Sequence, residues 1–166
     1  MTAETKPEFS IERVFNAPRA KVWAAWTDPA KLAQWFGPKG CTFEVLSCDV
    51  RPGGACHARF EHGSYVYFGK FAYREVTAPE RLVYEHGFAD PEGNFTASPF
   101  GGEWPLRLLT TVRFEDLGDK TRMALTWTPL EASVAEEAAF ADNLDSMTGG
   151  WSGSFDVLDE ALAAGD

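Results

Sequence analysis

The sequence has no long apolar run, few cysteines and histidines, and a shortage of basic residues. No segment approaches the roughly 18 consecutive apolar residues of a membrane-spanning helix. Fifteen Lys and Arg residues face 25 Asp and Glu residues, and the formal net charge of −10 repels phosphate backbones and anionic lipid surfaces. We therefore expect neither nucleic-acid binding nor membrane binding.

The cysteines argue against a zinc site and against a disulfide framework. Cys41, Cys48 and Cys56 contain no C-x-x-C pair, have no nearby Cys/His quartet, and leave one thiol unpaired in any pairing scheme. Only Lys39 lies near enough in sequence to lower a thiol pKa, so we expect buried, inert thiols. Because the N-terminal segment is polar and lacks the apolar core of a signal peptide, a cytoplasmic location is expected.

Alternating apolar residues and turn residues predict one strand, two short helices and six further strands. Residues 1–8 are expected to form a flexible tail, and residues 9–166 a single domain. Asp28-Pro29 is expected to open the second helix, which would include Leu32, Trp35 and Phe36. The expected strands are Phe9–Phe15, Cys41–Val50, Ala55–Glu61, Tyr65–Val76, Leu82–Phe88, Leu106–Glu115 and Thr121–Thr128. Short sequential strands joined by tight turns are typical of an antiparallel meander.

The last 35 or so residues change to a helical period. Apolar residues recur every three or four positions from Phe140 to Leu162, which predicts one long helix with a single apolar stripe. Gly149 and Gly150 in its middle cost about 2 kcal/mol relative to two alanines, so we expect a bend or a close approach there. The order of elements is α+β, and the sheet must bury its apolar face against this helix.

One long segment, Ala89–Pro105, has no periodic pattern. It carries Phe95, Phe100 and Trp104 among Gly, Pro and Asp residues. Rings in such a loop are expected to cover something apolar. The segment is expected to form either a lid at the mouth of a pocket or a loop packed on the sheet edge.

Several sequence motifs occur in a characteristic order along the chain. They are Phe15–Trp23, Trp26–Pro29, Leu32 with Trp35-Phe36, Asp49–Gly54, Pro79–Val83 and Gly150-Trp151. Together they resemble the AHSA-type branch of the START/Bet v 1-like (SRPBCC) superfamily, whose name refers to activators of the heat-shock-protein-90 ATPase. The resemblance extends from Phe9 to Leu162 and implies a helix-grip fold, with a seven-stranded curved antiparallel sheet around the C-terminal helix and a deep cavity between them. It also implies a homodimer and a chaperone partner as expectations.

Aromatic residues make up 14% of the chain, with six Trp, and indicate either a ring-rich core or a cavity for an apolar guest. His86 shares its strand face with Leu82, Tyr84 and Phe88, so it would either orient a polar ligand group, act as a general base, or sit in the core. The expected ligand-binding residues are Trp23, Tyr67, Phe71, Tyr84, His86, Trp104, Leu108, Trp127, Met147, Trp151 and Phe155.

The motifs of catalytic and cofactor sites are absent from the sequence. Gly150-Trp151-Ser152-Gly153 falls in a predicted helix and does not follow a strand, so it forms neither a nucleophile elbow nor a phosphate loop. Alternation separates His57 from His62, which argues against a metal site, and no cofactor or catalytic residue is predicted. We expect a protein that binds a small apolar or aromatic molecule. The alternatives are a chaperone ATPase-activator-like module and an enzyme resembling polyketide cyclases or hydrolases.

Overall fold

A seven-stranded antiparallel sheet and four helices make up the computed structural model, which describes residues 7–36, 40–99 and 102–163. The strands lie in the order β1-β7-β6-β5-β4-β3-β2, so consecutive strands from β2 to β7 are neighbours and β1 joins the far edge beside β7. The elements are β1 (Phe9–Phe15), α1 (Arg19–Thr27), α2 (Pro29–Leu32), β2 (Thr42–Cys48), β3 (Ala55–His62), β4 (Tyr65–Thr77), β5 (Arg81–Ala89), β6 (Leu108–Asp116), β7 (Thr121–Pro129), α3 (Val134–Asp142) and α4 (Leu144–Ala163).

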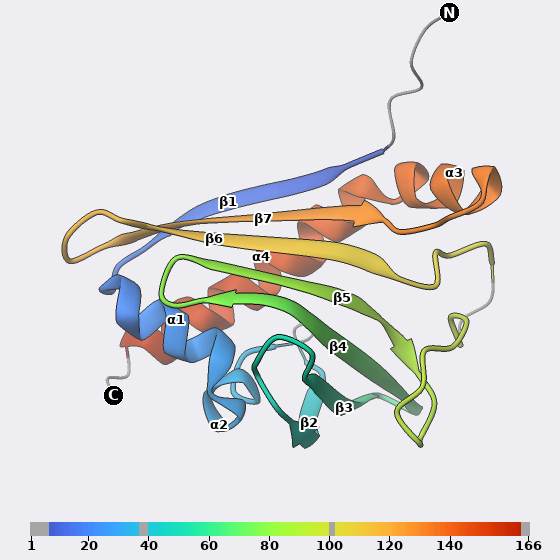
Figure 1. Ribbon diagram of the computed structural model, residues 1–166, viewed down its shortest axis with the longest axis horizontal. Coiled ribbons are helices and arrows are strands. Elements are labelled where there is room, and N and C mark those ends of the chain that lie inside the picture. The colour runs from blue at the N-terminus through green and yellow to red at the C-terminus, as the bar shows by residue number, and fades with distance from the viewer. Residues whose placement is uncertain (1–6, 37–39, 100–101, 164–166) are drawn as a thin grey trace, which may run out of the picture.

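The long helix α4 crosses one face of the sheet, with α1 and α2 near its C-terminal end and α3 at the other end (Figure 1). Alternate residues of β6 are buried on this face, including Leu108, Val112 and Phe114. The stripe that α4 buries includes Met147 and Phe155. The architecture confirms the predicted helix-grip α+β fold. The alternation of apolar residues in the strands explains it. A sheet with one apolar face needs an apolar helix against it.

Helix α4 lies closest to the β1 edge of the sheet. Its backbone approaches β1, and the Phe155 ring meets the Phe15 ring edge-on with 5.7 Å between centroids. One turn earlier, the Trp151 ring meets Trp127 of β7 at 5.4 Å. On the opposite half of the sheet, register shifts in β2 and β4 interrupt the regular pairing, and such bulges bend a strand. Space is therefore left between α4 and the middle strands.

The structure corrects three local predictions. The expected single C-terminal helix is two helices, because α3 ends at Asp142 and α4 begins at Leu144. A Ser133–Glu136 capping box marks the start of α3, a signal present in the sequence. The second helix opens at Asp28-Pro29 as predicted, and the Asp28 side chain accepts a hydrogen bond from the Ala30 amide. The helix ends at Leu32, so Trp35 and Phe36 follow it.

The third correction concerns the glycine pair of the last helix. Both residues lie within α4, and no atom comes within 4 Å of the place where a Cβ would stand on either Gly149 or Gly150. Of the two predicted alternatives, a bend and a close approach, the close approach is therefore wrong. Gly150 instead faces the open space described below.

Candidate functional site

A pocket of about 240 Å³ lies between α4 and the middle of the sheet. Its walls come from β3, β4 and β5, from the first residues of β6, from β7, and from one face of α4. Aromatic rings dominate these walls, and none of the described lining residues is Lys, Arg, Asp or Glu. The lining residues are Phe36, Phe60, Tyr67, Gly69, His86, Gly87, Phe88, Trp104, Leu108, Trp127, Met147, Gly150, Trp151 and Ser154.

Two glycines on opposite walls help to keep this space open. Gly69 lies on β4, where a Cβ would stand 2.8 Å from Cε2 of the Phe60 ring. The Phe60 ring is held in place because it stacks on Tyr67, at 4.9 Å and an interplanar angle of 3°. Across the pocket, Gly150 leaves a gap in the face of α4. Side chains at these two positions would narrow the pocket from both sides.

His86 is the most polar side chain on the sheet wall. Its ring lies edge-on to Phe71 at 4.8 Å and stacks against Trp127 at 5.6 Å. Its Nδ1 is buried and has no hydrogen-bond partner among the described residues. Burial lowers the pKa of His86 to about 4, so the imidazole is neutral at physiological pH. A neutral imidazole offers one donor and one acceptor.

Two further polar groups come from Trp127 and Tyr67. The Trp127 Nε1 is buried and, like His86 Nδ1, has no hydrogen-bond partner in the part of the chain that the structure describes. Burial, with a smaller contribution from the neighbouring Cys41, raises the pKa of Tyr67 to about 12. The phenol therefore stays protonated at any physiological pH. The pocket is thus an apolar chamber with a few neutral polar groups in its wall.

Seven of the eleven residues predicted to bind a ligand line this pocket. They are Tyr67, His86, Trp104, Leu108, Trp127, Met147 and Trp151.

Of the other four expected residues, Phe71, Tyr84 and Phe155 lie in the core, and Trp23 is partly buried against it. Trp23 of α1 packs edge-on against Phe114 at 5.3 Å, and Phe155 is fully buried beside β1. Phe71 and Tyr84 stack on each other at 5.0 Å and are also buried. Strand alternation placed these two rings on the correct face of the sheet. It did not show that they lie deeper along their strands than His86, where the core is already filled.

Sequence reasoning missed seven lining residues. Two of them had visible signals, since Phe88 shares the strand face of His86 and Gly150 is a glycine in the middle of a predicted helix, next to its apolar stripe. Phe36 follows the short helix α2, and only the tertiary structure brings it to the pocket. The remaining four are Phe60, Gly69, Gly87 and Ser154.

The segment between β5 and β6 supplies residues to both faces of the sheet. Phe95 forms a bridge with Ala89, and its ring lies 5.0 Å from the Lys70 ammonium. Trp104 lines the pocket and packs against Phe140 of α3 at 5.8 Å. Phe95 therefore fits the predicted packing on the sheet, whereas a lid formed by Trp104 stays a prediction. Phe100 lies outside the described residues.

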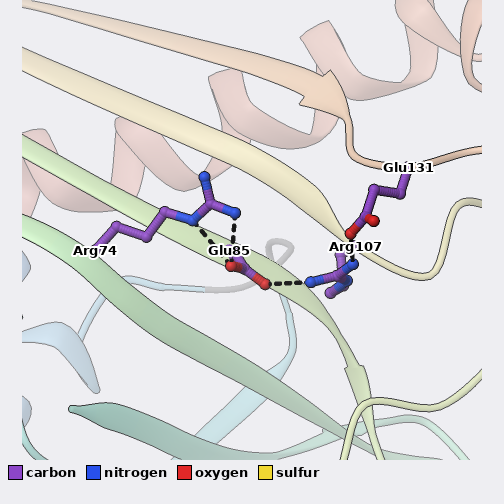
Figure 2. Close-up of polar contacts among 4 residues, drawn as sticks. All are labelled: Arg74, Glu85, Arg107 and Glu131. Carbon is purple, nitrogen blue, oxygen red and sulfur yellow. Dashed lines mark hydrogen bonds and ion pairs between the residues drawn. The ribbon is translucent and has the colours of Figure 1, made fainter. Parts of the chain in front are cut away.

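The charged residues Arg59, Glu103 and Arg107 do not line the pocket. Arg59 lies 3.6 Å from Glu61, Glu103 is exposed, and Arg107 joins an ion-pair chain. Figure 2 shows that chain, in which Glu85 accepts hydrogen bonds from Arg74 Nε at 2.9 Å and Arg107 Nη1 at 2.8 Å, while Arg107 also pairs with Glu131. Although burial raises the pKa of Glu85, the hydrogen bonds from Arg107 and Arg74 outweigh it and lower that pKa.

The ion-pair chain has a structural consequence. It connects β4 and β5 with the residues just before β6 and just after β7, and the Leu130 amide also donates to the Arg107 carbonyl at 3.0 Å. These contacts hold the segment that leads from β7 into α3. Since Phe140 of α3 packs against Trp104, the chain helps to position the helix beside the pocket.

Other candidate groups are dispersed over the molecule. His57 Nε2 lies 3.1 Å from the Asp90 carbonyl oxygen, and His62 is exposed. Within residues 7–36, 40–99 and 102–163, no three His, Cys, Asp or Glu side chains gather where a metal ion could be held. None of the helices formed by those residues has the length and apolar character needed to cross a membrane. Of the three free thiols only Cys56 is buried, so the expectation of uniformly buried cysteines is wrong for Cys41 and Cys48.

Solved structures with the same fold come from several bacteria. A protein from Arthrobacter aurescens is 26% identical, with a TM-score of 0.78 over 95% of this chain and 87% of that one. Protein Ms6760 from Mycobacterium smegmatis is 24% identical, with a TM-score of 0.77 over 96% and 92% of the two chains. The AHSA1 protein from Silicibacter pomeroyi is 20% identical, with a TM-score of 0.71 over 95% and 99%.

The family comparison agrees with these structural neighbours. No curated protein matches the chain. The family described as "Activator of Hsp90 ATPase homolog 1-like protein" matches residues 16–163, which span every helix and every strand except β1. The chain therefore belongs to the Activator of Hsp90 ATPase homolog 1-like family.

Proposed function

We propose that this protein binds a small, neutral, largely aromatic molecule in the pocket between α4 and the sheet. The observation that carries the proposal is the chemistry of the wall, which combines aromatic rings with a buried imidazole and a buried indole that lack hydrogen-bond partners among the described residues. An apolar pocket with a few polar groups is the usual form of a small-molecule site.

The absence of charge from the described lining selects the class of ligand. A charged group moved from water into an apolar site must be paired, and the cost of leaving it unpaired exceeds the gain from burying a ring. The described pocket residues offer no opposite charge to a carboxylate or an ammonium group. A neutral ligand that carries a single hydrogen-bonding group suits His86 and Trp127 better.

The volume limits the size of the ligand. A dry cavity of about 150 Å³ holds one benzene ring, whereas pockets for drug-sized molecules take roughly 300–1,000 Å³. The present pocket, at about 240 Å³, falls between these sizes. It suits a molecule of one or two fused rings.

His86 is assigned a role in orienting the ligand rather than in proton transfer. An efficient general base has a pKa near the working pH, and a pKa of about 4 makes this imidazole a weak base. The described lining residues also include no carboxylate that could act as its partner. These two facts favour a binding protein over the cyclase or hydrolase alternative.

A matched pair of probes tests the proposal. Naphthalene-2-carboxamide and naphthalene-2-carboxylate share the same ring system and differ in charge. We expect the amide to raise the melting temperature and to give a saturable calorimetric isotherm, with binding at least tenfold tighter than that of the carboxylate. Equal affinity for both probes, or no binding of any neutral one- or two-ring compound in a wider panel, would contradict the proposal.

The family description also names an ATPase activator, which provides the contrasting assay. The chain is added to Hsp90, and the rate of ATP hydrolysis is measured with and without the amide probe. Unchanged hydrolysis is the result expected of a ligand-binding protein. A stimulated rate would favour the activator-like role instead.

A further inference from the structure

Two cysteines face each other across the β2–β3 pair, away from the pocket. Cys48, the last residue of β2, is the direct register partner of Cys56 on β3. The register shifts between Val45 and Ser47, so an extra residue lies in β2 at this point. Without that bulge, alternation would turn Cys48 to the opposite face from Val45. The bulge therefore places the Cys48 side chain on the same sheet face as Cys56.

The hydrogen bonds beside the pair determine how close the two backbones come. The Asp49 amide donates to the Ala55 carbonyl at 3.0 Å, which makes the next pair along the ladder a hydrogen-bonded pair. Narrow and wide pairs alternate in antiparallel sheets, so Cys48 and Cys56 form a non-hydrogen-bonded pair, with about 4.5 Å expected between their Cα atoms. That separation is within the roughly 4.4–6.8 Å that disulfides span.

The turn between the two cysteines holds this geometry. Gly53 has φ of +85°, in the left-handed region that favours glycine, and its amide donates to the Tyr73 carbonyl at 2.9 Å. The Gly54 amide donates to the Arg51 carbonyl at 2.8 Å. A Cβ on Gly54 would stand 2.2 Å from the Asp49 carbonyl oxygen, so only glycine permits this close return of the chain.

The two thiols differ in exposure and in acidity. Cys48 is half-buried, whereas Cys56 is completely buried. A hydrogen bond from the Cys56 thiol lowers the pKa of Cys48 and outweighs the effect of burial. The same contact, together with burial, raises the pKa of Cys56. Cys48 is thus the thiol that reaches solvent and ionises first, and Cys56 keeps its proton.

We propose that Cys48 and Cys56 form a dithiol that hydroperoxides oxidise to an intramolecular disulfide, with Cys48 as the attacking thiol and Cys56 as the resolving thiol. In the first step the Cys48 thiolate sulfur bonds to one oxygen of hydrogen peroxide, and the O–O bond breaks. The departing hydroxide takes up a proton and leaves as water. Cys48 is oxidised by two electrons to a sulfenic acid, and the peroxide is reduced.

The second step closes the disulfide. The Cys56 sulfur attacks the Cys48 sulfur, the S–S bond forms, and the Cys48 S–O bond breaks. The hydroxyl group leaves with the proton of Cys56 as a second water. The sum is two thiols and one hydrogen peroxide giving one disulfide and two waters. No other residue has to supply electrons.

The test uses the full chain, first reduced and then treated with hydrogen peroxide. Remaining thiols are alkylated, and intact mass and peptide maps are recorded. We expect the loss of two hydrogen atoms, a peptide cross-linked between Cys48 and Cys56, and alkylation of Cys41. The Cys41→Ser control is expected to keep the cross-link, and Cys48→Ser is expected to lose it.

Several outcomes would overturn the assignment. These are alkylation of both Cys48 and Cys56 after peroxide has oxidised Cys41, oxidation of Cys48 to sulfinic acid with Cys56 still alkylated, and a cross-link that joins two chains. The cross-link map of the unaltered chain decides the matter even if a variant fails to fold, which circular dichroism would reveal.

Discussion

Replacing Gly150 by leucine should block the pocket without damaging the fold. Gly150 lines the pocket from α4, and no atom lies within 4 Å of the position of its missing Cβ. A leucine at this position can therefore extend into the open space. The neighbouring Gly149 has the same free surroundings but does not line the pocket, so Gly149→Leu is a matched control.

The two variants should differ in their affinity for the amide. Both should be more stable than the unaltered protein, and Gly150→Leu more so than Gly149→Leu. Leucine is favoured over glycine in a helix by about 0.8 kcal/mol, and both variants should gain this amount. Gly150→Leu should gain up to about 1.5–3 kcal/mol more if its side chain becomes buried in the pocket. Urea unfolding measures both changes. Calorimetry with naphthalene-2-carboxamide should show at least a tenfold loss of affinity, about 1.4 kcal/mol, for Gly150→Leu alone.

Two results would refute this reasoning. If Gly150→Leu binds the amide as well as the unaltered protein does, the ligand does not occupy the space between α4 and the sheet. If Gly149→Leu loses affinity equally, the change in the helix itself, rather than a filled pocket, is responsible.

Three further predictions concern pH and packing. The pKa of His86 is about 4 in the folded chain, whereas an unfolded histidine has a pKa near 6.5. As the pH falls from 6.5 to 4, the unfolded chain therefore binds a proton before the folded chain does. The free energy of unfolding should fall by about 3 kcal/mol over this range. His86→Phe should flatten that part of a urea-derived stability profile, whereas His62→Gln should not. Glu85→Gln should cost about 1–3 kcal/mol at pH 7. The pKa of Glu85 is depressed in the folded chain, so its contribution to the free energy of unfolding is complete above the unfolded pKa of about 4.3 and is lost below it. If the stability difference between Glu85→Gln and the unaltered protein were the same at pH 3 as at pH 7, this account would be contradicted. Gly69→Ala should cost about 1–3 kcal/mol by pushing on the Phe60 ring, and a neutral effect in urea would show that the ring moves freely.

Local patterns predicted most of the fold. Alternation located all seven strands to within a few residues, and turn residues between them indicated antiparallel neighbours. The C-terminal apolar stripe predicted the helix that covers the sheet, but not the break at Asn143. The stripe continues through this residue with the same spacing, yet the helix divides there. Phe140 of α3 packs against Trp104, whereas Met147 of α4 lines the pocket.

The candidate site was predictable in kind but only partly in detail. The face of β5 that carries His86 follows from alternation, as does the face of β7 that carries Trp127. Alternation also put Tyr84 on that face, yet its ring is buried against Phe71. His86 and Tyr84 lie on the same face of β5, and alternation cannot tell which of them faces open space. That depends on where along the strand α4 leaves a gap.

Taken alone, the sequence determined the secondary structure, the antiparallel pairing and the aromatic face that the last helix covers, because these depend on neighbours along the chain. The tertiary structure decided where that helix lies over the sheet, and hence where a pocket remains. It also set Cys48 opposite Cys56, through a one-residue bulge that no local pattern indicates. The position of the helix and the pairing of the two cysteines both depend on contacts between segments that are distant in sequence. These contacts form only when the whole sheet packs around α4.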